Sequence, residues 1–79
     1  MKTNEIKKGT RIQLANGWFG TMMDNRRGNI RMAEVEGMYT EMGSVYAWDI
    51  KRVLVGEYWV PVELTPAQRK ARRAASLFS

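Results

Sequence analysis

The sequence predicts a mainly β protein, a small antiparallel barrel of about five strands followed by a C-terminal α-helix. Three observations support this prediction. Segments in which apolar and polar residues alternate recur along the chain, and this is the period of a strand with one buried face. Residues that favour turns separate these segments at intervals of roughly ten residues, as in small barrels. Near the C-terminus, a Thr-Pro pair precedes a run of helix-forming residues.

The first two strands are expected on either side of Asn16-Gly17. Residues 10–15 alternate between polar and apolar, and residues 18–24 form the return strand. Asn-Gly is a strong hairpin signal because a type I′ turn needs positive φ at both central residues. The sequence therefore predicts a tight two-residue hairpin here.

Gly20 interrupts the return strand of this hairpin. A glycine within a strand marks either a bulge or a close approach of another backbone. We favour the bulge, because it allows both Phe19 and Met22 to be buried. Trp18, at the hairpin tip, is then expected to be exposed.

Three further strands complete the predicted sheet. Residues 37–43 are expected to form a loop or a distorted continuation of the preceding strand, and residues 49–52 a short helical turn. Pro61 predicts an edge position for the last strand, since proline cannot donate to a ladder. The helical turn leads into residues 53–55, and the expected strands are residues 30–36, 44–50 and 58–64.

The C-terminal segment predicts a basic amphipathic helix. Thr65 is a good N-cap and Pro66 is favoured at the first helical position, so the helix runs from there to about Leu77. We divide the chain into a barrel of residues 1–64 and this helix of residues 65–79. The thin apolar face of the helix is expected to pack lightly on the barrel through Ala67, Ala71, Ala74 and Phe78.

Positive charge is concentrated in this tail. The chain has 13 basic and 8 acidic residues, a net charge of +5. Residues 65–79 hold four basic residues and no acid, whereas the first 64 residues hold nine basic and eight acidic ones. Such a tail favours a polyanionic partner, nucleic acid or an acidic protein surface.

The absent residue types narrow the function further. The sequence has no cysteine and no histidine, so it lacks disulfides, thiolate metal sites and the commonest general base. We therefore expect no enzyme, no catalytic residue, no metal and no cofactor. No apolar run approaches the length of a membrane span and the first residues are polar, so we expect no membrane association and a cytoplasmic location.

The run KKGTRIQLANGWFGTMMDN resembles the opening of SH3-like small barrels, including those with a KOW-type pattern. The residues that carry the resemblance are Lys8, Gly9, Ile12, Leu14, Gly17, Gly20, Thr21 and Met22. The stretches GSVYAWDI and VELTPAQ are similar to short phage and prophage proteins of the same outline. The resemblance implies an SH3-like barrel, a phage origin with a location in the host cytoplasm, and no catalytic residue. KOW-type modules contact RNA, DNA or protein through the loop around the glycine of their motif. The resemblance therefore implies a contact surface near Asn16, Trp18 and Phe19.

The function preferred on these grounds is a small phage-type binding module that contacts nucleic acid or a nucleic-acid-bound complex. The basic helix would dock on phosphates, aided by basic and aromatic residues of the hairpin loops. An ordinary solvated surface is the simpler interpretation of the same charges. The residues of this candidate site are Arg69, Lys70, Arg72, Arg73, Arg26, Arg27, Trp18 and Phe19.

A protein-binding accessory or inhibitor is the alternative function, acting on a host or phage protein such as a defence or replication factor. Its contact residues would be Met38, Tyr39 and Met42, together with Trp18, because methionine and aromatic side chains are common at interfaces. A structural role in a virion ranks third, and the oligomeric state is left open. The remaining large aromatic residues are expected to fill the core: Tyr46, Trp48 and Trp59.

Overall fold

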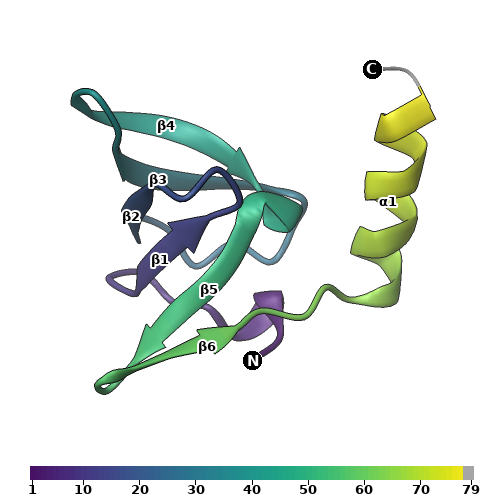
Figure 1. Cartoon of the computed structure of the whole chain (residues 1–79). Helices are drawn as coiled ribbons and strands as arrows, with labels where there is room; N and C mark the ends of the chain where they lie inside the picture. The colour runs from purple at the N-terminus through teal and green to yellow at the C-terminus, as the bar shows by residue number, and fades with distance from the viewer. Residues whose placement is uncertain (78–79) are drawn as a thin grey trace.

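The computed structural model describes residues 1–77 (Figure 1). Its chain forms one six-stranded antiparallel sheet, followed by a single C-terminal helix, α1 (Pro66–Leu77). The mainly β class with a C-terminal helix is confirmed, with six strands rather than five. The strands are β1 (Arg11–Leu14), β2 (Phe19–Met22), β3 (Ile30–Glu36), β4 (Thr40–Tyr46), β5 (Ile50–Val55) and β6 (Tyr58–Pro61).

The strand order is β4-β3-β2-β1-β5-β6, so β4 and β6 are the two edges of an open sheet. Two short 3₁₀ turns, η1 (Thr3–Glu5) and η2 (Ala47–Asp49), precede β1 and β5. The sheet is strongly curled, and α1 stands to one side of it next to η2 (Figure 1). The edge position predicted for the last strand from its proline is confirmed.

The core occupies the inner side of the curled sheet. It combines side chains from five strands with Ile6, which comes from the segment after η1 and is almost fully buried. Burial alternates along β1 and β2, as expected for strands with one inner face. The core residues are Ile6, Ile12, Leu14, Met22, Ala33, Val45, Ile50 and Val53.

Strand β3 has the predicted bounds, whereas β4 does not. β4 begins at Thr40, within the segment expected to be a loop or a distorted continuation of the preceding strand, and ends at Tyr46, before η2. As an edge strand, β4 is exposed at most positions on both faces. Its sequence therefore lacks the alternation that identifies a half-buried strand. The predicted helical turn at residues 49–52 is also wrong, because the 3₁₀ turn begins two residues earlier, at Ala47, and β5 begins at Ile50.

The first hairpin differs from the predicted one by one residue. Phe19 pairs with Gln13 rather than with Leu14, which leaves three residues, 15–17, in the loop. Gly17 has a φ of 91° and Asn16 does not have a positive φ. The Asn16 side chain instead accepts a hydrogen bond from the N–H of Trp18, at 3.0 Å. A three-residue loop ending in a left-handed glycine thus replaces the expected type I′ turn.

This register overturns the bulge predicted at Gly20. The β1–β2 ladder is regular through Gly20, which faces inward opposite Ile12. A Cβ on Gly20 would lie 2.7 Å from the carbonyl oxygen of Glu34, so the glycine permits a close approach of β3. Met22 is buried as expected, but Phe19 points outward and is 40% exposed.

A buried arginine ties the N-terminal segment to the sheet. Arg31, on the inner face of β3, is 0% exposed. Its guanidinium donates hydrogen bonds to the carbonyl oxygens of Thr3 and Gly28 and to Oδ1 of Asn4, at 2.5, 3.1 and 3.1 Å. Burial lowers the pKa of Arg31, because the charged form loses hydration. These three acceptors replace the lost water, so the N-terminal segment is held in place by a buried cation.

Helix α1 is fastened by its first turn. The N–H of Gln68 donates to Oγ1 of Thr65 at 3.2 Å, and the N–H of Thr65 donates to Oε1 of Gln68 at 3.0 Å. This reciprocal pair is a capping box, and it confirms Thr65 as the N-cap. The buried Gln68 side chain also donates to Oδ1 of Asn4 at 3.2 Å and accepts from the hydroxyl of Thr3. The helix is thereby attached to the segment that Arg31 holds.

The expected alanine face of α1 is not the face that meets the sheet. Ala67 and Ala74 are exposed and Ala71 is half-buried. Gln68 makes the buried contact instead, because its polar side chain finds partners in the N-terminal segment. Phe78, also expected on that face, lies outside the described residues.

Candidate functional site

The basic residues of α1 form the main candidate site. All four are exposed, and residues 1–77 contain two ion pairs, Arg11–Glu36 and Arg26–Asp24. No acid of the described chain therefore neutralises the helix. The residues are Arg69, Lys70, Arg72 and Arg73.

Three of these cations share one side of the helix. Arg69, Arg72 and Arg73 line a shallow hollow of about 250 Å³ together with Ser76. Residues three or four apart are neighbours on a helix surface, which explains the grouping. Arg69 also donates a hydrogen bond to the carbonyl oxygen of Leu64, at 3.2 Å, which directs its guanidinium toward the N-terminal end of the helix.

The loop between β2 and β3 carries the two other predicted cations, Arg26 and Arg27, and both are exposed. The buried network joins this loop to the foot of α1, since Arg31 contacts both Gly28 and Asn4, and Gln68 contacts Asn4. The structure thus links the loop and the helix, the two basic segments of the predicted site.

An aromatic pair beside α1 was not predicted as part of the site. The rings of Tyr46 and Trp48 are stacked, with centroids 4.7 Å apart and planes at 6°. We expected both in the core, but Tyr46 is 48% exposed and Trp48 is partly exposed. Tyr46 is the last residue of the edge strand β4. Its side chain points outward, and the preceding residue, Val45, points into the core. The signal available in the sequence was the close spacing of two large aromatic residues at a strand end.

Trp18 and Phe19 lie away from this site. Phe19 pairs with Glu36, and a Cβ on Gly37 would lie 2.3 Å from the Trp18 ring. Phe19 and Trp18 therefore lie at the Glu36 end of β3. Tyr46 pairs with Ile30 at the near end. The six residue steps from Ile30 to Glu36 correspond to about 20 Å along β3. The structure therefore does not bring Trp18 and Phe19 to the basic helix, although Trp18 is exposed as expected.

The two aromatic residues lie instead with the residues of the alternative interface. Met38 and Tyr39, in the turn after Gly37, are 86% and 74% exposed. The Phe19 ring also contacts the exposed Trp59 across the outer face, with centroids 5.4 Å apart. We call this group the apolar end, and it consists of Trp18, Phe19, Met38, Tyr39 and Trp59. Met42, also exposed, lies on the adjoining outer face opposite Glu34.

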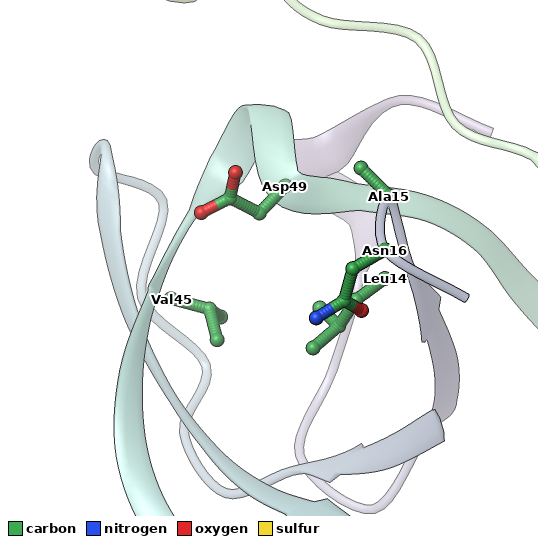
Figure 2. A pocket seen from close by; sticks show the side chains of 5 residues that line it. All are labelled: Leu14, Ala15, Asn16, Val45 and Asp49. Carbon is green, nitrogen blue, oxygen red and sulfur yellow. The ribbon is translucent and has the colours of Figure 1, made fainter. Parts of the chain in front are cut away.

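A second hollow of about 290 Å³ opens at the end of the core (Figure 2). Leu14 and Val45 lie at its base, and the Asn16 amide and the Asp49 carboxylate lie at its rim (Figure 2). Both rim groups serve local turns: Asn16 accepts from Trp18, and Asp49 accepts from the N–H of Tyr46 at 3.2 Å. We therefore assign these residues to the fold and not to a binding site.

The ion pair of the outer face lies near the apolar end. Arg11 donates to Glu36 and, at 3.1 Å, to Oγ1 of Thr21. The hydrogen bond to Glu36 raises the pKa of Arg11, and the same bond lowers the pKa of Glu36. This pair connects β1 to β3 on the outer face of the sheet and does not involve the cations of α1.

Comparison of the chain with family models, with curated proteins and with solved structures gives no match. Neither helix α1 nor any other helical segment of residues 1–77 is long and apolar enough to cross a bilayer. In the same part of the chain, no group of three or more potential side-chain ligands is placed to hold a metal ion. The function is therefore inferred from the residues and their arrangement.

Proposed function

We propose that the protein binds nucleic acid, or a complex that contains it, through the basic face of α1. The observation that supports this most directly is the set of four exposed helix cations that no acid of residues 1–77 neutralises. Each phosphate that such a cation neutralises releases condensed counterions, which is the main source of affinity in sequence-independent binding. We propose that Arg27, and Arg26 despite its ion pair with Asp24, add contacts from the loop that the buried network links to the helix.

We also propose that the curled sheet is a small SH3-like barrel of phage origin. The support for the barrel is the meander from β1 to β4, the return of β5 to β1, and the glycine pattern of the first hairpin. The phage origin is proposed from the resemblance of the stretches GSVYAWDI and VELTPAQ. An experimental structure in which the two halves of the sheet lie flat and apart would contradict the barrel.

Salt dependence tests the nucleic-acid proposal. We expect fluorescence anisotropy with a labelled oligonucleotide of random sequence to show binding at low salt. The affinity should fall steeply between about 50 mM and 200 mM salt, in proportion to the phosphates neutralised. Absence of binding to single- and double-stranded oligonucleotides at low salt would overturn the proposal.

Matched variants assign the contact to the helix. Arg73→Gln should lower the slope of log affinity against log salt by about 1, and Lys70→Gln with Arg73→Gln by about 2. Arg52→Gln is the control, because it removes the same charge from an exposed position on β5. Equal effects of Arg73→Gln and Arg52→Gln would show that net charge, not the helix, governs binding.

A protein partner for the apolar end is the second candidate function, as an accessory or inhibitor of another protein. The observation in its favour is the exposure of Met38 and Tyr39 next to two exposed tryptophans, Trp18 and Trp59, since aromatic residues and methionine dominate interface energetics. Monomeric proteins rarely expose such groups contiguously.

The test is retention of a single protein from nuclease-treated lysate of the host. We expect Met38→Ser with Tyr39→Ser to abolish that retention and Arg73→Gln to preserve it. Retention that survives the double variant would contradict an interface at the apolar end.

A further inference from the structure

A cleft separates α1 from the aromatic pair at the end of β4. Its volume is about 400 Å³, within the range of small-molecule sites. Tyr46 and Trp48 line one side, and Arg72, Ala75 and Ser76 of α1 line the other. Figure 1 shows α1 beside the end of β4 and η2, where the cleft lies.

The aromatic side of the cleft is fixed by hydrogen bonds. The N–H of Tyr46 donates to Asp49 at 3.2 Å, and the N–H of Ala47 donates to the carbonyl oxygen of Asn29 at 2.7 Å. The stacked rings of Tyr46 and Trp48 are thus held at a defined strand end and remain accessible to solvent. A rigid aromatic surface of this kind binds a planar ring with little loss of conformational entropy.

The helix side of the cleft supplies positive charge. Arg72 lines the cleft and also the adjoining hollow of Arg69 and Arg73. Two acids lie nearby. Asp49 accepts the hydrogen bond from the N–H of Tyr46, and Glu63 shares a third hollow with Arg69 and Arg72 at the N-terminal end of the helix; neither forms an ion pair with the helix cations. Aromatic rings next to several cations match a ligand that combines a planar ring with phosphates.

We propose that this cleft holds an unpaired base of single-stranded nucleic acid while the adjoining arginines contact its phosphates. The inference rests on the proposed nucleic-acid function and specifies its ligand. In a duplex, the faces of each base are covered by its neighbours, so they cannot stack on Tyr46 or Trp48. A single strand exposes them, and base–aromatic stacking is the usual way in which proteins hold single strands without reading their sequence.

Filling the cleft tests this inference. Ala75→Leu places a larger side chain in the cleft at an exposed helical position, and Ala74→Leu places the same side chain at the neighbouring exposed position outside the cleft lining. The probes are labelled single strands of DNA and of RNA of about 12 nucleotides, and the duplex of the same sequence. We expect Ala75→Leu to weaken single-strand binding by about tenfold and to leave duplex binding unchanged. Ala74→Leu should change neither.

Removal of a ring provides the second measurement. Trp48→Ala should weaken single-strand binding by about tenfold or more, and Trp48→Phe should restore most of the loss. Trp59→Ala is the matched control, because that exposed tryptophan lies at the apolar end. Circular dichroism of each variant reports whether the fold is retained. If Trp48→Ala does not fold, the binding data of Ala75→Leu alone test whether a base occupies the cleft.

Three results would overturn the inference. Equal affinity for single strand and duplex, with Arg73→Gln weakening both, would leave the proposed function intact and exclude a base in the cleft. Unchanged single-strand binding in Ala75→Leu would exclude the cleft as its place. Binding of dextran sulfate as tight as that of the oligonucleotide would show that charge alone is recognised. Failure of every oligonucleotide to bind would instead reject the proposed function itself.

Discussion

The two ends of β3 present two different surfaces. At the Ile30 end lie η2, the Tyr46–Trp48 pair and the cations of α1. At the Glu36 end lie the five residues of the apolar end, and the nearby charges are an ion pair with each other. About 20 Å of strand separates the two. Trp18 and Phe19, which the sequence groups with the basic helix, therefore belong to a different surface from its cations, whereas Tyr46 and Trp48 share the surface of those cations.

The largest effect is expected from loss of the buried cation at the Ile30 end. Arg31→Met removes two hydrogen bonds to the N-terminal segment and one to Gly28, and leaves Asn4 and two carbonyl oxygens without this donor. We expect a loss of about 3 kcal/mol in the free energy of unfolding. Urea denaturation measures it, with the exposed Arg27→Met as control, for which a change below about 0.5 kcal/mol is expected. Similar values for the two variants would contradict the role given to Arg31.

A smaller loss is expected where α1 is attached. Gln68→Ala removes the side-chain half of the capping box and the bonds to Thr3 and Asn4, which we expect to cost about 2 kcal/mol. Lys70→Ala, at an exposed position of the same turn, is the control. Thermal unfolding gives the comparison. If Gln68→Ala proves as stable as the control, the helix is held by contacts other than its first turn.

At the apolar end, Gly37→Ala should have a modest effect on stability and a clear effect on the surface. The added Cβ would meet the Trp18 ring at 2.3 Å, and this exposed side chain can move aside. We expect a cost of about 1 kcal/mol and a red shift of tryptophan emission as Trp18 moves into water. Gly43→Ala, whose Cβ meets no atom within 4 Å, is the control. Oligonucleotide binding should be unchanged, and a loss of binding would show that the two ends are coupled.

The smallest effect concerns the ion pair near the apolar end. The pKa of Glu36 in the folded protein is below its ordinary value of 4.5, because Arg11 hydrogen-bonds to the carboxylate. The pair therefore stabilises the fold above that pH, and its contribution disappears as the pH falls through the lowered folded pKa. We expect wild type and Glu36→Gln to converge in stability as acid is added. A constant difference between them across the acid range would contradict this linkage.

Local signals in the sequence predicted part of the fold well. The alternation of residues 30–36 and the Thr65-Pro66 start of α1 gave the observed bounds of β3 and the helix. Both depend on the period of a buried face or on the chemistry of a cap, which neighbouring residues determine. The cations of the helix were likewise predicted, because exposed charge needs no tertiary partner.

Other features depend on contacts between distant segments, and the sequence did not reveal them. An edge strand such as β4 has no buried face, so it has no period to detect. The register of the first hairpin depends on the hydrogen bond that the Asn16 side chain accepts from the N–H of Trp18 within the loop. Gln68 and the Tyr46–Trp48 pair acquire their roles only when α1 lies beside η2. One missed signal was available: Arg31 falls on the same face as Ala33 and Val35, and an arginine there requires buried acceptors.

Helix α1 is fixed through its first turn, and its twelve residues extend for about 18 Å from that attachment. A small rotation about Thr65 and Gln68 therefore displaces the distal turns far more than the proximal one, as in an arm hinged at one end. Substitutions at Thr65 or Gln68 are therefore expected to alter the width of the cleft between α1 and the Tyr46–Trp48 pair without replacing any side chain that lines it.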